Sequence, residues 1–251
     1  MLIVYAMPRL KFFVEKAVED IADRRLDRIL LPLPKSSERI LREHIQCNNS
    51  FSEFLRDLLK YMKLDLVYSK RYYYLEPLYS LLKTILSIRE VDIVCYKTLG
   101  NELTEIEFCE KIVLLTARTL ITEKINVEAW REALISKDEK VIEDKCQRIL
   151  EYSAEETVAL VEYSARRLLN CLKKHSAVIV KPKDYVPLPL EVLVACGELL
   201  NNNDLVFLIR MHLDFVKNYL YRCKDYEEAY FRWLNRISEK NKEYILKLYR
   251  I

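Results

Sequence analysis

Five short apolar segments rich in β-branched residues recur along the chain, and each ends with lysine or arginine. They are Leu2–Arg9, Arg28–Lys35, Leu64–Arg71, Val91–Lys97 and Ser176–Lys183. Continuous apolar runs of this length are typical of strands buried on both faces of a sheet. Helical patterns separate the first four segments, which favours parallel pairing through right-handed crossovers. The chain therefore predicts a three-layer α/β fold with a mainly parallel, five-stranded sheet.

The rest of the chain reads as helices that follow the fourth and fifth segments. Thr104, Asn126, Asp138 and Ser153 each stand where an N-cap would begin a helix, the last one reaching about Lys174. Residues 205–223 and 226–250 predict a C-terminal helical pair. We therefore expect an α/β core (1–100 plus 175–200), a helical insertion (101–174) and a C-terminal helical extension packed on the core (201–251).

Charge is distributed unevenly along the sequence. Residues 1–100 carry 17 basic and 13 acidic side chains, whereas residues 101–165 carry 8 and 15. Residues 166–251 carry 16 basic and 10 acidic side chains, so the overall net charge is only +3. The predicted insertion is therefore an acidic block between two basic regions.

Several types of site are excluded by residues that the chain lacks. Glycine occurs only at positions 100 and 197, which excludes Gly-rich phosphate loops and nucleophile elbows. The three histidines are far apart and the seven cysteines have no zinc-site spacing, so we expect no metal and no cofactor. The odd cysteine count and apolar neighbours predict reduced thiols. With no signal peptide or membrane span, they indicate a cytoplasmic protein. The Lys- and Glu-rich, Gln-poor composition resembles that of thermophiles.

The cations that follow the five segments form the strongest functional signal. In an open parallel sheet the carboxyl ends of the strands share one edge, where ligands bind and helix N-termini favour anions. The predicted ligand-binding cations are Arg9, Lys35, Lys70, Arg71, Lys97, Lys181 and Lys183. Tyr73, within a run of three tyrosines, could stack on a base. The leading hypothesis is a non-catalytic module that binds a nucleotide or nucleic-acid backbone; the alternative is that these cations only face solvent.

Two other functions stay open. The acidic region 101–174 or the aromatic, basic region 205–251 could dock a protein partner or a second copy, and a large exposed apolar patch there would favour this. A hydrolase acting on a phosphorylated or nucleic-acid substrate would need carboxylates converging beside the cations. Near the predicted loops the sequence offers only Glu38, Glu76 and Asp184. No catalytic residue is assigned.

The predicted order is four strand–helix units, a helical insertion, and a last strand with its helix. This order is similar to that of the TraB/ChaN-like proteins. The histidine and glutamate signatures of that group have no counterpart in this chain. The resemblance therefore concerns the order of elements alone and implies no function.

Overall fold

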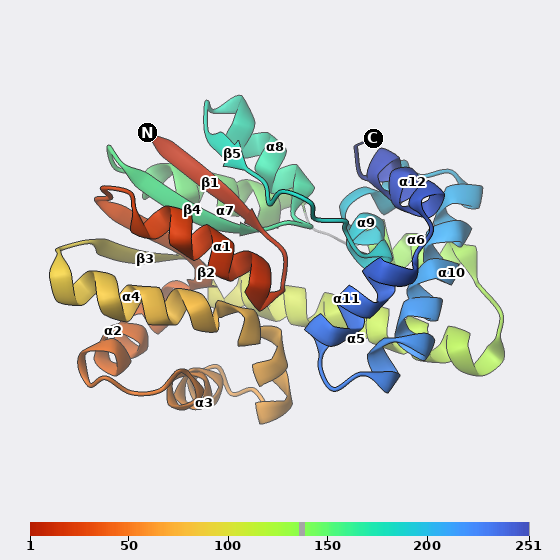
Figure 1. Cartoon of the computed structure of the whole chain (residues 1–251), viewed down its shortest axis with the longest axis horizontal. Helices are drawn as coiled ribbons and strands as arrows, with labels where there is room; N and C mark the ends of the chain where they lie inside the picture. Colours follow the sequence, from red (N-terminus) through yellow and green to blue (C-terminus); the bar gives the residue numbers. More distant parts are fainter. Residues whose placement is uncertain (136–138, 251) are drawn as a thin grey trace. The chain divides into compact units, whose positions relative to one another are not determined.

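The computed structural model describes residues 1–135 and 139–250, and it contains one five-stranded sheet (Figure 1). The strands lie in the order β3-β2-β4-β1-β5, and every pair is parallel. Their bounds are β1 (Leu2–Met7), β2 (Arg28–Pro34), β3 (Asp92–Lys97), β4 (Thr157–Glu162) and β5 (Val178–Val180). The predicted fold class, a three-layer α/β fold with a parallel five-stranded sheet, is confirmed.

Helices cover both faces of the sheet. The chain runs from β1 through β2 to β3 in one direction and returns through β4 and β5. Right-handed crossovers therefore place the two sets of helices on opposite faces. One face carries α1 (Lys11–Ala22), α2 (Glu38–Gln46), α3 (Phe51–Tyr61) and α4 (Glu76–Ile88), and the other carries α7 (Glu139–Glu151) and α8 (Arg166–Lys174) (Figure 1).

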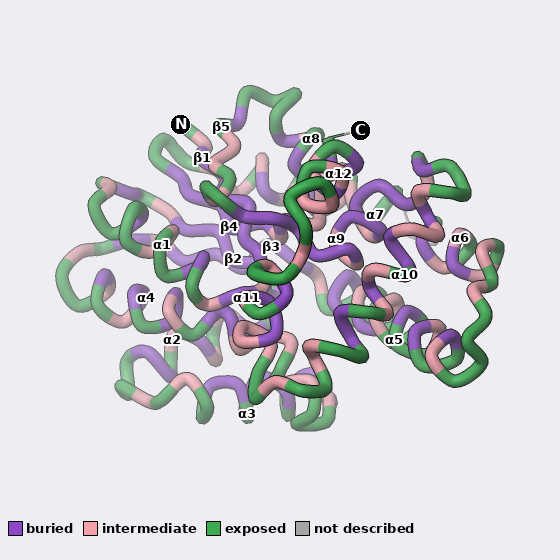
Figure 2. The backbone as a smooth tube through the Cα atoms, turned by 45° about the vertical axis from the view of Figure 1, so that its right-hand side comes forward, coloured by how far each residue is buried: buried purple, intermediate pink, exposed green. Residues whose placement is uncertain are grey.

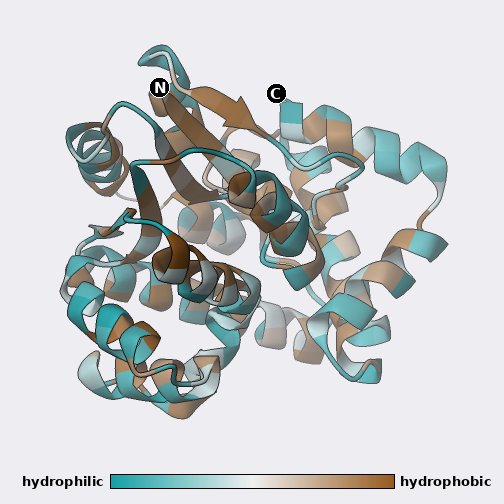
Figure 3. Ribbon diagram, turned by 60° about the vertical axis from the view of Figure 1, so that its left-hand side comes forward, coloured by the Kyte–Doolittle hydropathy of each residue, from teal (hydrophilic) through white to brown (hydrophobic). Residues whose placement is uncertain are grey.

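Strands β1–β4 are buried because both faces of the sheet are covered, whereas β5, at the edge of the sheet, is partly exposed. Figure 2 shows the central strands as buried tube, and Figure 3 shows them as the hydrophobic part of the sheet. Alternate strand residues join one core with α1, α3 and α4; these include Ile3, Tyr5, Ile29, Leu31, Ile93, Val158 and Leu160. Their neighbours face the opposite way because side chains alternate along a strand.

Two compact units divide the chain. Unit 1 comprises Met1–Leu103, Lys140–Tyr163 and Leu168–Pro182, and it contains the sheet. Unit 2 comprises Thr104–Glu139, Ser164–Arg167 and Lys183–Ile251. It holds most of α5 (Leu99–Thr122) with α6 (Val127–Ile135), α9 (Pro189–Cys196), α10 (Asn202–Asn218), α11 (Tyr226–Arg236) and α12 (Glu239–Arg250).

The core of unit 2 is built from helix faces around two fully buried tryptophans. Trp130 of α6 and Trp233 of α11 are 0% and 1% exposed, and Tyr230 packs beside Trp233. The predicted C-terminal helical pair is confirmed. Its first helix is α10, and its second is divided at Ile237 and Ser238 into α11 and α12. The predicted cap at Asp138 lies outside the described residues. None of the described helices combines the length and apolar character that a bilayer crossing requires.

The predicted strand at Leu64–Arg71 is wrong. This segment forms a 3₁₀ helix over Leu66–Arg71, where the side chain of Asp65 accepts a hydrogen bond from the Val67 amide at 3.0 Å. Leu66 and Val67 are 61% and 64% exposed, so only Leu64 and Tyr68 of this apolar run pack against the core. A second 3₁₀ turn, Tyr73–Leu75, then leads into α4.

The predicted helix from Ser153 to Lys174 is also wrong in its first half. Residues Thr157–Glu162 form β4, which pairs with both β1 and β2 and is therefore an interior strand. A fully buried strand reads as a continuous apolar run, and periodicity alone does not distinguish such a run from a buried helical segment. Region 101–174 is accordingly not entirely helical.

The prediction of reduced cysteines is wrong for one pair. Cys146 of α7 and Cys171 of α8 form a disulfide, with their Cα atoms 6.4 Å apart. They are 25 residues apart in sequence, and the strand between their helices brings them together. The remaining cysteines, Cys47, Cys95, Cys109, Cys196 and Cys223, form no disulfide.

Candidate functional site

The carboxyl ends of β1, β3 and β4 bring charged side chains together at one edge of the sheet. Lys97 ends β3, Glu162 ends β4, and Arg9 follows β1 by two residues. Arg9 Nη2 donates to both carboxylate oxygens of Glu162 at 2.9 Å. Lys97 Nζ lies 3.6 Å from Glu162 Oε1, so both cations contact the same carboxylate. Two predicted cations are therefore brought together by one carboxylate, although β1 and β3 are not adjacent in the sheet.

A second, fully buried carboxylate joins this network. Glu102, in the first turn of α5, is 0% exposed. Its oxygens accept hydrogen bonds from Lys97 Nζ at 3.0 Å, Arg71 Nε at 2.8 Å and the Tyr72 hydroxyl at 2.7 Å. The burial of this charge is tolerable because two cations and a hydroxyl compensate for lost water. Its place near a helix N-terminus is also favourable.

The segment that was predicted as a strand covers this edge instead. Its 3₁₀ helix and the 3₁₀ turn that follows bring Arg71 and three consecutive tyrosines, residues 72–74, to the network. The Tyr73 hydroxyl donates to the carbonyl oxygen of Arg9 at 2.7 Å, and Lys11 Nζ lies 5.9 Å from the centre of the Tyr73 ring. Tyr73 is thus partly engaged within the protein rather than presenting a fully exposed ring.

The buried tyrosines stay protonated because an ionised phenol would be costly in this environment. Burial, followed by the nearby Glu162 charge, raises the pKa of Tyr74 to about 12. Burial also raises the pKa of Tyr72, and the charge of Glu102 and its hydrogen bond with that carboxylate add to the effect. Tyr72 therefore acts as a hydrogen-bond donor to Glu102 and not as a base.

We name this set the edge network: Arg9, Arg71, Lys97, Glu102 and Glu162. Its three cations and two carboxylates leave a formal charge of +1. Exposure differs within it, since the side chains of Lys97 and Glu102 are 4% and 0% exposed, whereas Arg9 is 31% exposed. A ligand from solvent would therefore meet Arg9 first.

The other predicted cations lie outside this network. Lys35, at the end of β2, is paired with Glu38 at 2.9 Å and lies 4.7 Å over the Tyr152 ring. Lys70 is exposed, and so is Lys181, whose ammonium lies 6.0 Å over the Tyr163 ring. Lys183 belongs to unit 2, so it is not placed beside the edge network. Three of the seven predicted cations, Arg9, Arg71 and Lys97, are thus linked through shared carboxylates.

Two helical turns begin at this edge without side-chain caps. Leu10 is the N-cap of α1 and makes no capping hydrogen bond, and the first turn of α1 contains no acidic residue. Pro34 likewise precedes the 3₁₀ turn Lys35–Ser37 without capping it. Uncapped amide groups at a helix N-terminus favour an anion. The α1 terminus lies directly after Arg9, so both would act on the same ligand.

Sequence reasoning missed both carboxylates of the edge network. The sequence places Glu162 in a predicted helix, and Glu102 is one of many acids in the predicted acidic block. The signal that could have found Glu162 is the strand-like apolar run Val158–Val161 followed by a charged residue, which repeats the pattern of the other strands. No local signal marks Glu102.

Catalysis at the edge network is disfavoured by how its carboxylates are bonded. Glu102 accepts three hydrogen bonds and is inaccessible, and Glu162 is held by Arg9 and Lys97. Neither is free to act as a general base toward a substrate. Within the described part of the chain, no group of three or more His, Cys, Asp or Glu side chains is arranged to hold a metal ion.

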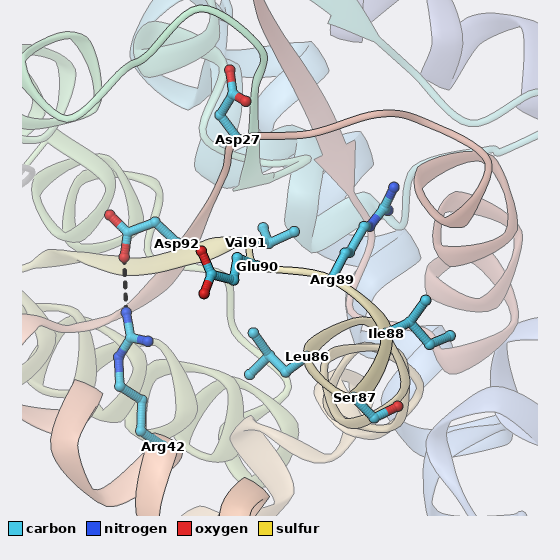
Figure 4. A pocket seen from close by; sticks show the side chains of 9 residues that line it. All are labelled: Asp27, Arg42, Leu86, Ser87, Ile88, Arg89, Glu90, Val91 and Asp92. Carbon is cyan, nitrogen blue, oxygen red and sulfur yellow. Dashed lines mark hydrogen bonds and ion pairs between the residues drawn. The ribbon is translucent and has the colours of Figure 1, made fainter.

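An open pocket of about 730 Å³ lies at the opposite, amino end of the strands (Figure 4). Its charged groups pair within the protein: Arg42 Nη2 contacts Asp92 Oδ1 at 2.8 Å, and Arg28 contacts Asp92 Oδ2 at 3.0 Å. Arg89 points away from Asp92 and donates to the Arg24 carbonyl at 2.7 Å. Three carboxylates, Asp27, Glu90 and Asp92, make this end unfavourable for an anion.

Comparisons of the chain with protein-family models, with curated proteins and with solved structures find no match.

Proposed function

We propose that this protein binds an anionic ligand, a nucleotide or the backbone of a nucleic acid, at the carboxyl edge of its sheet. The observation that carries the proposal is the excess of cations over carboxylates in the edge network, three against two. Ligands of open parallel sheets bind outside the carboxyl ends of the strands. A phosphate group would complete the charge balance of this network.

Arg9 is the residue that would contact the ligand. Its guanidinium is 31% exposed and adjoins the uncapped N-terminus of α1. Guanidinium groups bind phosphate through two parallel hydrogen bonds. Glu162 would still be paired with Lys97 if Arg9 turned toward a phosphate, so the exchange leaves no carboxylate unpaired. Lys35 and Lys181, on neighbouring loops, would add longer-range attraction.

The rival functions differ in their support. A hydrolase would need an available carboxylate, and both carboxylates of the edge network are engaged. The prediction of a protein-interaction surface in region 101–174 stays a prediction beside anion binding. It is favoured by the large apolar side chains that α5 exposes.

Isothermal titration calorimetry of the full chain with ATP, and separately with a short single-stranded oligonucleotide, tests the proposal. Arg9→Gln removes the charge that meets the ligand and should weaken binding roughly 10- to 150-fold, since a charge-assisted hydrogen bond contributes roughly 1.5–3 kcal/mol. Lys174→Gln is the matched control, because Lys174 ends α8 shortly before β5 begins and therefore lies at the amino end of that strand, away from the carboxyl edge. Tighter binding of ATP would favour a nucleotide, and tighter binding of the oligonucleotide a nucleic acid. Absence of binding to both probes, or equal affinities for Arg9→Gln and the native chain, would refute it.

A further inference from the structure

The two edges of the sheet differ in how their outward backbone groups are bonded. At the β3 edge, side chains of α2 occupy these groups. Glu38 Oε1 accepts a hydrogen bond from the Cys95 amide at 2.6 Å. Arg42 Nη2 donates to the Ile93 carbonyl at 2.9 Å. At the other edge, β5 pairs with β1 on its inner side, and within the described part of the chain no further strand pairs with its outer side (Figure 1).

The register of the sheet identifies the backbone groups of β5 that face outward. The Tyr163 amide donates to the Met7 carbonyl at 2.9 Å, so odd-numbered residues of β1 direct their backbone groups to β4. Successive residues of a strand direct these groups to opposite sides, so Val4 directs its own to β5. Val4 is the partner of Ile179, and in a parallel ladder it bonds to the residues on either side of that partner. The N–H and C=O of Ile179 therefore face away from β1.

The side chains of β5 are suited to an added strand. The strand consists of three aliphatic residues, with no proline and no charge among them. Val178 is 48% exposed, and Ile179 and Val180 are half-buried. An unpaired strand edge of this kind binds an extended peptide, whose backbone bonds to the edge and whose side chains contact those of the strand. The backbone of β5 therefore calls for an extended segment rather than a helix.

Charge around β5 selects the chemistry of that segment. Residues 163–188, which contain β5, carry six basic side chains and one acidic side chain. Lys173 and Lys174 precede the strand and Lys181 follows it, and all three are exposed. The one acid, Asp184, belongs to unit 2, and β1 contains no charged residue. The acids of α1 lie over one face of the sheet, where α1 packs against α4, and not in the plane of this edge. Lysines at both ends of an aliphatic strand favour a peptide with acidic residues around an aliphatic centre.

We infer that the outer edge of β5 binds an extended, acidic segment of a partner protein as a sixth strand of the sheet. A second copy of this chain is a poorer occupant. Antiparallel pairing of two β5 strands about a two-fold axis would bring Lys174 of each copy toward Lys181 of the other. Because β5 is short, few backbone hydrogen bonds can form, and the affinity depends strongly on charge. This inference is independent of anion binding at the edge network.

Fluorescence anisotropy of a labelled peptide, titrated with the full chain, tests the inference. The probe has a Val-Ile-Val centre flanked by glutamates, and the control probe has lysines in their place. The native chain should bind the glutamate peptide at least about tenfold tighter, since like charges disfavour the lysine peptide. Equal affinity for the two peptides, or no binding of the glutamate peptide, would overturn the inference.

Ile179→Pro tests whether the backbone of β5 makes the contact. Proline removes the outward N–H but none of the amide groups that bond to β1, so the sheet keeps its pairing, which circular dichroism checks. Binding of the glutamate peptide should weaken about tenfold. Hydrogen exchange of the native chain gives a second readout, because the Ile179 amide should become protected when the peptide binds. An amide that the bound peptide leaves unprotected would contradict strand addition at this edge.

Reversal of charge tests the selection of an acidic segment. Lys174→Glu combined with Lys181→Glu should reverse the preference, so that the lysine peptide binds more tightly than the glutamate peptide. The matched control is Lys70→Glu, at an exposed lysine outside residues 163–188, and it should bind like the native chain. An unchanged preference in the double variant would overturn the proposed chemistry. Sedimentation equilibrium without peptide addresses the other occupant: self-association that Ile179→Pro abolishes would assign the edge to a second copy and overturn the inference.

Discussion

The buried histidine behind α5 should make unit 2 sensitive to acid. His212 of α10 is 6% exposed, and its Nε2 lies 3.0 Å from Thr116 Oγ1. Burial lowers its pKa from 6.5 to about 4, because desolvation disfavours the charged imidazolium. In the unfolded chain this histidine binds a proton as pH falls through 6.5, whereas in the folded chain it binds one only near pH 4. Stability is therefore unaffected by this group above neutral pH and decreases as pH falls from 6.5 toward 4.

The size of the effect follows from the two pKa values. A difference of about 2.5 units corresponds to about 3.4 kcal/mol below pH 4, of which about 2 kcal/mol is already lost at pH 5. Urea unfolding at pH 8 and pH 5 measures the loss for the native chain and for His212→Gln. Since other groups also titrate, the relevant quantity is the difference between the two chains. His175→Gln, at an exposed position, is the control and should behave like the native chain.

The His212→Gln chain should lose less stability than the native chain between pH 8 and pH 5, by about 2 kcal/mol. Equal losses in both chains would mean that His212 is already charged, or accessible to water, in the folded protein. That result would refute the assignment of a neutral, desolvated imidazole to this position.

Three further changes test contacts elsewhere in the fold. Glu102→Gln removes the negative charge that compensates the buried Lys97 and Arg71, and it should lower the free energy of unfolding in urea by about 3 kcal/mol. The control is Glu76→Gln, at an ion pair whose carboxylate is 48% exposed, and it should cost under about 1 kcal/mol. Equal costs would contradict a buried edge network. Gly197→Ala places a Cβ 2.7 Å from Leu134 Cδ1 and should destabilise the chain by about 1–3 kcal/mol. Leu134→Ala should relieve that clash, and a fully additive double variant would contradict the contact. Replacing Cys146 and Cys171 by serine should lower the free energy of unfolding by about 3 kcal/mol, because the disulfide closes a loop between cysteines 25 residues apart and so restricts the unfolded chain. A reductant that destabilises the native and the double-serine chains by the same amount would contradict the disulfide.

Four of the five strands are predictable because each is an apolar run bounded by charged residues or proline. The remaining strand, β4, is not predicted, because Thr157–Glu162 follows a Ser-Ala-Glu-Glu sequence that resembles a helix cap. What makes it a strand is its pairing with β1 and β2, which is a tertiary interaction. Segment Leu64–Arg71 shows the converse error, because its strand-like composition finds no place in the sheet.

The candidate site is predictable only in its cations. Parallel strands bring Arg9 and Lys97 to one edge, and this follows from the order and length of the elements. Their partners do not follow, because Glu162 reaches the edge through the unpredicted strand and Glu102 through the first turn of α5. Arg71 arrives on a 3₁₀ turn that covers the edge rather than on a strand of the sheet. The sequence therefore indicates where positive charge gathers but not how much of it is neutralised.

The salt dependence of ligand binding tests the central claim most directly. If phosphate groups bind at the edge network, the affinity for a single-stranded oligonucleotide should fall steeply between about 50 and about 200 mM salt. Arg9→Gln should reduce the slope of log K against log salt by about one, whereas Lys174→Gln should leave it unchanged. An affinity that does not change with salt, or a slope that is the same in Arg9→Gln and the native chain, would contradict anion binding at this edge.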